Sequence, residues 1–514
     1  MPEMEQNGII LTGLMQKLNH KLLKMKKTIL LFLLISASAY AQKTVNWVSS
    51  SPEKQWKIEP ANLIAKNTSN KVDVVVNLDQ VQQTIEGFGA CFNEAGWVSL
   101  SYLSLDDRES VIQELFAPNK GANFSICRMP LGANDFSRQW YSYNETEGDF
   151  AMNNFSISND YQTLVPFIKN AQKYNPSLKL WASPWSPPTW MKYNKHYASK
   201  PVPDISTWSE ESLQSMRNDW GMDFRGINNG MKPEQEMHEG SDMFVQDEKY
   251  FKAYSLYFSK FIDAYREEGI NIGMVMPQNE FNSAQVFPSC TWRASGLVKF
   301  VSFLGPEMQK KGVDVYLGTM ERGNAKLVDT LLSDPLSKDH IKGVGFQWGG
   351  KDAIATIHKQ YPKMNLYQTE QECGNGYNDW KYCKYAWSLM KHYLNNGVCT
   401  YQYWNISLSD GGVSTWGWHQ NSLVVVDTLQ KTYRYTYEYY LMKHLSHYVK
   451  PNAKKVATSG EFNDLLAFVN PDKSVVVLIN NAENTEKTVN IKINGKVLNP
   501  TLKPNTINTL LVRF

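Results

Sequence analysis

The central part of the chain alternates between short apolar runs and longer amphipathic segments. The apolar runs are rich in β-branched and aliphatic residues, as buried strands are, and the amphipathic segments have the period of a helix. In residues 250–268, for example, Tyr254, Tyr257, Phe258 and Phe261 recur at helical spacing. Eight strands are predicted in this way: residues 84–89, 123–129, 178–182, 271–276, 313–317, 341–347, 364–369 and 398–404.

Eight strands that each precede a helical segment indicate an α/β protein with a (β/α)8 TIM barrel, predicted over residues 83–444. A doubly wound sheet is the alternative, but it usually has fewer strands and a glycine-rich phosphate turn. Gly87-Phe88-Gly89 follows a strand and lacks the third glycine of that turn. The barrel is therefore favoured.

The two ends of the chain have a different pattern, with apolar runs separated by turn signals such as Asn470-Pro471-Asp472. We expect residues 445–514 to form a β-sandwich attached to the barrel, together with one or more N-terminal strands from residues 42–82. The strands expected in it are residues 71–77, 465–469, 474–480, 488–493 and 507–512.

A polar, turn-rich insertion at residues 193–247 interrupts the third strand–helix unit. Insertions that follow barrel strands lie at the catalytic mouth of such folds. The insertion therefore either shapes a substrate cleft or decorates the surface, and the sequence favours neither role.

The N-terminus has the features of a secretory signal peptide over residues 25–41. A basic start at Met25-Lys26-Lys27 precedes an apolar run at residues 29–35 and a small-residue cleavage site at Ala39-Tyr40-Ala41. Residues 1–24 are interpreted as an extension upstream of the true start. No Cys follows the cleavage site, so we expect a secreted or periplasmic protein without a membrane anchor.

Charge and composition narrow the classes of partner. The formal net charge of +3 comes from residues 1–41, and the rest of the chain has 48 basic and 48 acidic residues. A neutral chain gives no support for binding to nucleic acid or to an anionic membrane. Aromatic residues make up 13% of the chain, which suits both core packing and stacking against sugar rings.

The six cysteines have no CxxC or zinc-site spacing. Buried free thiols are the favoured interpretation, and a Cys373–Cys383 disulfide is left open. No G-x-S-x-G, HExxH or P-loop string is present, and His444 with His447 is interpreted as a structural pair. We therefore predict neither a metal nor a cofactor.

Two glutamates lie at the ends of predicted strands. Glu280 follows the fourth strand and Glu370 ends the seventh. Hydrolysis of a glycosidic bond needs two carboxyl groups, one to protonate the leaving oxygen and one to attack the sugar or activate water. A single glutamate of this kind is more often a helix cap or a salt-bridge partner. Two of them at matching barrel positions favour catalysis.

Three tryptophans, Trp185, Trp348 and Trp404, end the third, sixth and eighth predicted strands. Each alone is as consistent with the core as with a binding site. As a set at strand ends, they are predicted to form the floor and wall of a sugar subsite.

Several strings together give a family resemblance: Thr84-Ile85-Glu86-Gly87-Phe88-Gly89, Arg128-Met129-Pro130-Leu131, Asp135-Phe136-Ser137, Ala182-Ser183-Pro184-Trp185-Ser186-Pro187-Pro188-Thr189-Trp190, Gln278-Asn279-Glu280, Thr369-Glu370 and Tyr403-Trp404-Asn405. From about Val72 onward the chain resembles glycoside hydrolase family 30, which contains glucosylceramidases and β-1,6-glucanases. The resemblance implies a retaining β-glycosidase with a barrel and a β-sandwich.

The resemblance also implies roles for individual residues. Glu280 would be the general acid/base and Glu370 the nucleophile, held by Arg128. Asn279 would bind the sugar 2-hydroxyl, and Asp135 the hydroxyls of the non-reducing end. These roles require a raised pKa for Glu280, and we expect hydrogen-bond donors and a cation to lower the pKa of Glu370.

The chain departs from the glucosylceramidases after the sixth strand, where they have His-Trp-Tyr and this chain has Gln347-Trp348-Gly349. Gln347 and Trp348 are both expected to bind the substrate. Another group must then supply the hydrogen bond that the tyrosine gives to the nucleophile. Glu372 is a rival nucleophile, although the family pattern matches Glu370. The departure favours a polysaccharide or oligosaccharide substrate, first β-1,6-glucan. The alternatives are a glucosylceramidase and a non-catalytic glycan-binding protein.

Overall fold

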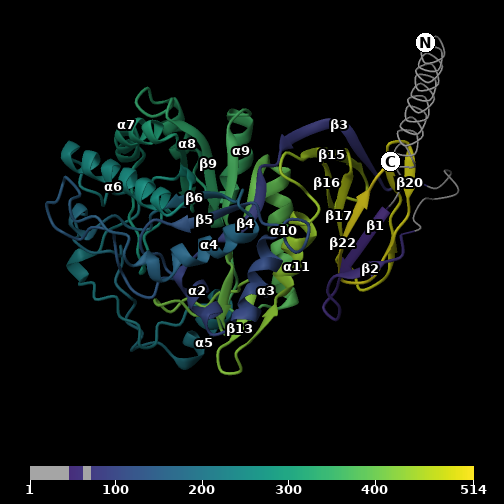
Figure 1. Cartoon of the computed structure of the whole chain (residues 1–514), viewed down its shortest axis with the longest axis horizontal. Helices are drawn as coiled ribbons and strands as arrows, with labels where there is room; N and C mark the ends of the chain where they lie inside the picture. Colours follow the sequence, from purple (N-terminus) through teal and green to yellow (C-terminus); the bar gives the residue numbers. More distant parts are fainter. Residues whose placement is uncertain (1–44, 62–70) are drawn as a thin grey trace, which may run out of the picture.

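The computed structural model describes residues 45–61 and 71–514, in which a closed barrel stands beside a β-sandwich (Figure 1). The predicted signal peptide and the extension before it lie outside the described residues. The barrel has eight parallel strands in the order β10-β11-β4-β5-β6-β7-β8-β9. Their bounds are β4 (Gly87–Cys91), β5 (Ile126–Pro130), β6 (Lys179–Ser183), β7 (Ile272–Val275), β8 (Asp314–Met320), β9 (Ile341–Gln347), β10 (Asn365–Glu370) and β11 (Val398–Asn405).

Helices follow the strands and surround the barrel (Figure 1). The predicted helix at residues 250–268 is α6 (Glu248–Glu267), capped by the side chain of Asp247. The four aromatic residues of the predicted pattern are all buried in it, as their spacing predicts. The other helices are α2 (Glu94–Ser101), α3 (Leu105–Phe116), α4 (Leu164–Tyr174), α5 (Glu210–Trp220), α7 (Ala294–Lys311), α8 (Ala325–Ser333), α9 (Ile354–Gln360), α10 (Trp380–Asn395) and α11 (Tyr437–Ser446).

The predicted barrel is confirmed, and all eight strands are present with ends shifted by at most three residues. The first strand begins three residues later than predicted, because Thr84 belongs to β3 (Val74–Thr84) of the sandwich and pairs there with Lys454. Gly89 allows β4 and β5 to lie close together, since a Cβ at this position would lie 1.9 Å from the carbonyl oxygen of Ile126 in β5. The glycines of this string therefore belong to barrel packing.

Strands from both ends of the chain interleave in the sandwich, as predicted. The strand expected at residues 488–493 is split into two short strands. The nine-stranded sheet has the order β2 (Lys57–Glu59), β1 (Val45–Ser50), β22 (Thr506–Val512), β17 (Val475–Asn481), β16 (Leu465–Val469), β15 (Lys454–Gly460), β3, β19 (Ile491–Ile493) and β20 (Lys496–Leu498). Smaller sheets are formed by β18 (Lys487–Thr488) with β21 (Thr501–Leu502), and by β12 (Ser407–Ser409), β13 (Val424–Asp427) and β14 (Thr432–Tyr435).

Both faces of β17 are buried, which explains its continuous apolar sequence. Val475, Val477 and Ile479 face the core of the sandwich. Val476 and Leu478, on the opposite face, join the hydrophobic core of the barrel. The sandwich is therefore packed against the barrel through a shared apolar layer.

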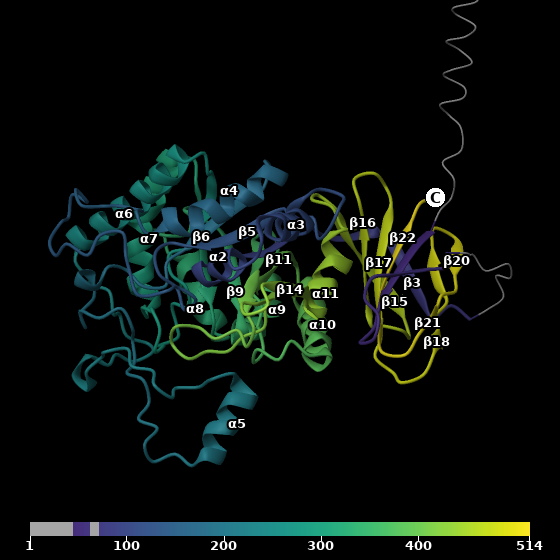
Figure 2. The same cartoon turned by 60° about the horizontal axis from the view of Figure 1, so that its bottom comes forward.

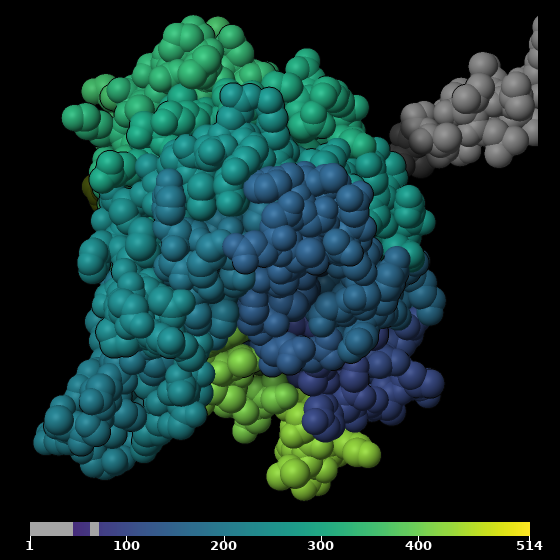
Figure 3. All heavy atoms as spheres, turned by 90° about the vertical axis from the view of Figure 1, so that its left-hand side faces the viewer, coloured from purple at the N-terminus to yellow at the C-terminus, as the bar shows by residue number. Residues whose placement is uncertain are grey.

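The predicted insertion at residues 193–247 holds α5, which projects from the barrel in Figure 2 and has no buried residue. In Figure 3 this teal segment and the yellow-green hairpin of β13 and β14 protrude at the lower edge of the molecule. The predicted domain boundaries stay predictions. No helix within the described ranges is long and apolar enough to cross a membrane. All six cysteines are buried free thiols.

Candidate active site

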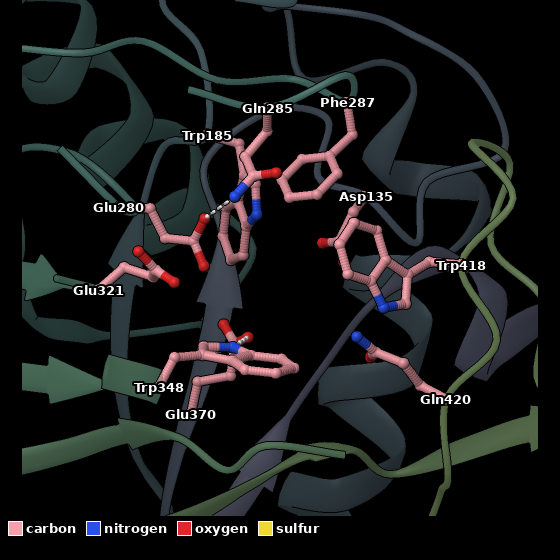
Figure 4. A pocket seen from close by; sticks show the side chains of 10 residues that line it. All are labelled: Asp135, Trp185, Glu280, Gln285, Phe287, Glu321, Trp348, Glu370, Trp418 and Gln420. Atoms are coloured by element: carbon pink, nitrogen blue, oxygen red, sulfur yellow. Dashed lines mark hydrogen bonds between the residues drawn. The ribbon is translucent and has the colours of Figure 1, made fainter. Parts of the chain in front are cut away.

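A cavity opens at the carboxyl ends of the barrel strands (Figure 4). Glu280 lies in the loop after β7, Trp348 directly follows β9, and Glu370 is the last residue of β10. Parallel barrel strands deliver these side chains to one mouth although they are far apart in sequence. The lining residues are Asp135, Trp185, Glu280, Gln285, Phe287, Glu321, Trp348, Glu370, Trp418 and Gln420.

Three donors hold the carboxylate of Glu370. Arg128 donates from Nη1 to Oε2 at 2.8 Å, and the indole Nε1 of Trp348 donates to Oε1 at 2.9 Å. Gln347 donates to Oε2 at 3.1 Å. This chain lacks the tyrosine of the His-Trp-Tyr string. Trp348 and Gln347 donate hydrogen bonds to the nucleophile in its place.

Arg128 is fully buried beneath the pocket, where it has three kinds of partner. It forms the ion pair with Glu370, and Nη2 donates to Asn279 Oδ1 at 2.7 Å and to Ser183 Oγ at 2.9 Å. Its guanidinium carbon lies 4.3 Å from the ring centroid of Trp185. The planar, multiply bonded guanidinium fixes the orientation of the Glu370 carboxylate.

Among the described residues, the hydrogen-bond donors to Glu280 are neutral amides. Oε1 accepts from Gln347 at 3.1 Å and Oε2 from Gln285 at 3.3 Å. Its backbone is left-handed, with φ of 48°, and its N–H donates to Thr319 Oγ1 at 2.9 Å. Trp348 is also left-handed, with φ of 47°. Such conformations are costly for these residue types and are concentrated at functional sites.

One amide nitrogen joins the two glutamates. Nε2 of Gln347 lies 3.1 Å from Oε1 of Glu280 and 3.1 Å from Oε2 of Glu370. These two oxygens therefore cannot be farther apart than twice that distance, about 6 Å. Both carboxyl groups face a single cavity.

Burial raises the pKa of both glutamates. For Glu280, desolvation is the largest cause and the negative charges of Glu321 and Glu370 add to it, so its pKa lies well above the usual range. For Glu370, desolvation is again the largest cause, but the charge of Arg128 opposes it. The expected lowering of the pKa of Glu370 is wrong, because burial outweighs the cation. The cation still makes Glu370 the stronger acid of the pair.

The structure brings all nine predicted site residues together in two layers. Asp135, Trp185, Glu280, Trp348 and Glu370 line the cavity. The other four are buried directly behind it: Arg128, Asn279, Gln347 and Trp404.

Asp135 lines the cavity and has one unpaired carboxyl oxygen. Its carboxyl group is buried, and Oδ1 has no hydrogen-bond partner among the described residues. Desolvation, followed by the charge of Glu370, raises its pKa well above the usual range. A sugar hydroxyl that reaches this oxygen would satisfy it.

The rival residue Glu372 does not line the cavity. Its carboxylate pairs with Lys351 at 2.8 Å and accepts from Tyr385 at 2.8 Å. It is therefore an ordinary salt-bridge partner.

His444 is buried between Thr509 Oγ1 and Ser50 Oγ, each at 2.9 Å. The ring thus ties α11 to β22 and β1 of the sandwich. The structural interpretation of this histidine is confirmed.

Five lining residues were not predicted: Gln285, Phe287, Glu321, Trp418 and Gln420. Glu321 directly follows β8 and has the same sequence signal as the two predicted glutamates, a carboxyl group after an apolar run. Trp418 and Gln420 lie in a long loop between β12 and β13, where no local pattern marks them.

The insertion contributes no side chain to the lining of the cavity. It supports the rim from outside, since Met222 forms a β-bridge with Trp418 and Ala198 with Pro288. The insertion therefore shapes the substrate cleft indirectly, by supporting its rim, and its helix α5 decorates the surface.

Comparison with known proteins gives a consistent result. The model of the glycosyl hydrolase family 30 TIM-barrel domain matches residues 85–202 and 230–449, and that of the family 30 β-sandwich domain matches residues 452–510. Lysosomal acid glucosylceramidase of Mus musculus is 24% identical over 455 residues, covering 83% of this chain and 80% of that protein. The endo-1,6-β-D-glucanase of Neurospora crassa is 23% identical over 454 residues, covering 83% and 85%. The crystal structure of SrfJ from Salmonella typhimurium has the same fold, with a TM-score of 0.78 and 22% identity over 92% of this chain and 100% of that one.

Proposed function

Because the chain belongs to glycosyl hydrolase family 30 and is therefore a glycoside hydrolase, we propose that it cleaves β-linked glucose by double displacement. Glu370 attacks the anomeric carbon while Glu280 protonates the leaving oxygen. Water, deprotonated by Glu280, then hydrolyses the glycosyl-enzyme intermediate.

The observation that carries this proposal is the unequal environment of two close carboxyl groups. Glu370 is paired with the buried guanidinium of Arg128, whereas Glu280 accepts only from amides. The paired group is the one that stays ionised, as a nucleophile must, and the other keeps a proton to donate. The upper bound of about 6 Å on their facing oxygens supports retention, since inverting enzymes hold the two groups about 6.5–9.5 Å apart.

The composition of the pocket supports a carbohydrate on both sides of the scissile bond. The lining is aromatic or polar throughout, with four aromatic residues and six carboxyl or amide residues. Aromatic faces stack on sugar rings, and the carboxylates and amides bond to hydroxyl groups. The first choice is β-1,6-glucan or its oligosaccharides, which is consistent with the likeness to the Neurospora crassa endo-1,6-β-D-glucanase.

Glucosylceramide is the second candidate, favoured by the likeness to lysosomal acid glucosylceramidase. Its lipid tails need an apolar surface, whereas the lining here has no aliphatic side chain. Parallel assays on a linear β-1,6-glucan and on a glucosyl lipid in detergent distinguish the two. Product length by chromatography then tells exo from endo action.

We also propose that the protein is exported after cleavage before Gln42, as the features of residues 25–41 suggest. N-terminal sequencing of protein recovered from the periplasm and medium tests this. A mature protein that starts upstream of residue 42 in the cytoplasmic fraction would contradict it.

Two substitutions test the assignment of the carboxyl groups. Glu370→Gln keeps the shape of the side chain but removes the nucleophile, so kcat/KM falls by about 1,000-fold or more. Glu280→Ala keeps slow turnover of aryl glucosides whose leaving group needs no proton, and loses about 100-fold or more on glucans. Glu372→Gln is the matched control and stays active. Full activity of Glu370→Gln would refute the mechanism.

A further inference from the structure

Glu321 is a third carboxyl group in the pocket, and the double displacement does not use it. It directly follows β8 and its side chain is only 10% exposed. In Figure 4 its carboxyl group lies beside that of Glu280, on the side away from Gln285. Two carboxyl groups this close cannot both be ionised without cost.

Arg322 forms an ion pair with Glu321 and fixes its position. Nη1 of Arg322 lies 2.6 Å from the carboxylate of Glu321, and Nη2 donates to Glu239 Oε1 at 3.0 Å. The side chain of Asn282 accepts from the N–H of Glu321 at 3.2 Å and of Arg322 at 3.3 Å. The loop that carries Glu280 is thus tied to the loop that carries Glu321.

Glu239 connects this cluster to the insertion at residues 193–247. Besides Arg322, it accepts from the N–H of Ala284 at 3.3 Å, in the loop after Glu280. Glu239 thus links the insertion to Arg322 and to the loop after Glu280, although the insertion places no side chain in the lining of the cavity.

We propose that Glu321 is a positioning residue that keeps the carboxyl group of Glu280 protonated between turnovers, and that Arg322, which Glu239 holds in place, keeps Glu321 charged for this task. The inference rests on the proposed role of Glu280 as general acid. Glu321 acts through Glu280 and needs no contact with the reacting atoms.

The distribution of cations explains where the proton resides. Glu370 is paired with Arg128, and Glu321 is paired with Arg322. Glu280 lies among them with amide partners only. When the two paired groups are ionised, their charges disfavour a third negative charge, so the proton remains on Glu280.

Other charged groups also act on this pair. The groups that face Glu280 or Glu321 are Glu370 and Arg128 in the barrel, Asp135 after β5, Arg322 after β8 and Glu239 of the insertion. Glu370 and Asp135 stay in place when Glu321 is replaced, so their effect on Glu280 is common to both proteins. The shift between the two proteins therefore reports the loss of the Glu321 charge together with the release of Arg322 from its ion pair, and both changes lower the pKa of Glu280.

The test is the pH dependence of kcat/KM for Glu321→Gln, measured with an aryl β-glucoside whose phenol is a weak acid. The basic limb reports loss of the proton from Glu280. We expect it to move to lower pH by about one unit or more, since a unit charge within a few ångströms in a protein is worth that much. The acid limb moves less, because Glu370 keeps Arg128.

Two controls separate the outcomes. Glu280→Ala must first abolish the basic limb; if that limb persists, the proposed function fails and not only this inference. With that result in hand, an unmoved basic limb in Glu321→Gln, or an equal loss of rate at every pH, overturns the role of Glu321. Glu372→Gln, whose carboxylate pairs with Lys351, leaves both limbs in place. If Glu321→Gln does not fold by circular dichroism, Glu321→Ala has the same expected shift.

Discussion

Replacing Trp348 with phenylalanine removes one hydrogen-bond donor from the nucleophile and little else. The indole Nε1 donates to Oε1 of Glu370 at 2.9 Å, and the ring lines the cavity. Phenylalanine keeps an aromatic face toward the sugar. It also has the same Cβ, so the left-handed backbone at this position costs the same in both proteins.

The expected magnitude follows from the kind of bond that is lost. A hydrogen bond to a charged group contributes about 1.5–3 kcal/mol, and about 1.4 kcal/mol corresponds to one pKa unit. The donor stabilises the ionised form of Glu370, so its loss raises the pKa of Glu370 by about one to two units. Arg128 and Gln347 still donate to Oε2 and keep the effect near the lower end.

The assay is the acid limb of kcat/KM for an aryl β-glucoside. Glu370 must be ionised to attack, and its ionised fraction falls as pH drops through its pKa. A raised pKa therefore moves the acid limb to higher pH by about one unit, with little change of rate on the plateau. The basic limb, set by Glu280, stays in place.

Trp387→Phe is the matched control, since its Nε1 also donates to a carboxylate, Asp464 Oδ1, at 2.8 Å in the contact between α10 and the sandwich. This variant loses stability and keeps both limbs. If Trp348→Phe left the acid limb unmoved, the bond would not stabilise the ionised nucleophile and the argument would be refuted.

Two further predictions concern buried charges. Arg128→Lys keeps a positive charge but loses the planar guanidinium that reaches Glu370, Asn279 and Ser183 together. We expect kcat/KM to fall by about 100-fold or more in steady-state kinetics, while circular dichroism shows a folded protein. Near wild-type activity would contradict the need for the guanidinium. Burial lowers the pKa of His444 from 6.5 to about 3, so the unfolded chain binds a proton there that the folded protein does not, and stability is lost as pH falls from about 6.5 toward 3. Urea denaturation of His444→Gln, which cannot titrate, should show a weaker decline over that range than the wild type; equal slopes would disprove the contribution.

Much of the fold was predictable because its signals are local. Each barrel strand is an apolar run between a turn and an amphipathic helix, and its position at the barrel mouth follows from the order of units. The error at Thr84 arose where two sheets follow one another without a break, since β3 ends there and β4 begins at Gly87. Local pattern cannot tell which sheet such a residue joins.

The site was predictable only in part, because some of its residues follow a recognisable sequence pattern and others do not. Glu280, Glu321 and Glu370 all follow apolar strands, and the sequence signal for the third was the same as for the other two. Trp418 and Gln420 reach the cavity from a long irregular loop. Their positions depend on tertiary contacts, such as the β-bridge between Met222 and Trp418, that no sequence period reveals.

The protonation of the site is decided by tertiary partners and not by local sequence. Glu280 and Glu370 both reach the mouth of the barrel, and burial raises the pKa of both. What distinguishes them is Arg128, which reaches Glu370 from β5 on another part of the barrel. An amide that bonds to both, from Gln347, cannot make this distinction, because it donates equally to each. The division of labour between acid and nucleophile therefore follows from where the fold places its guanidinium groups.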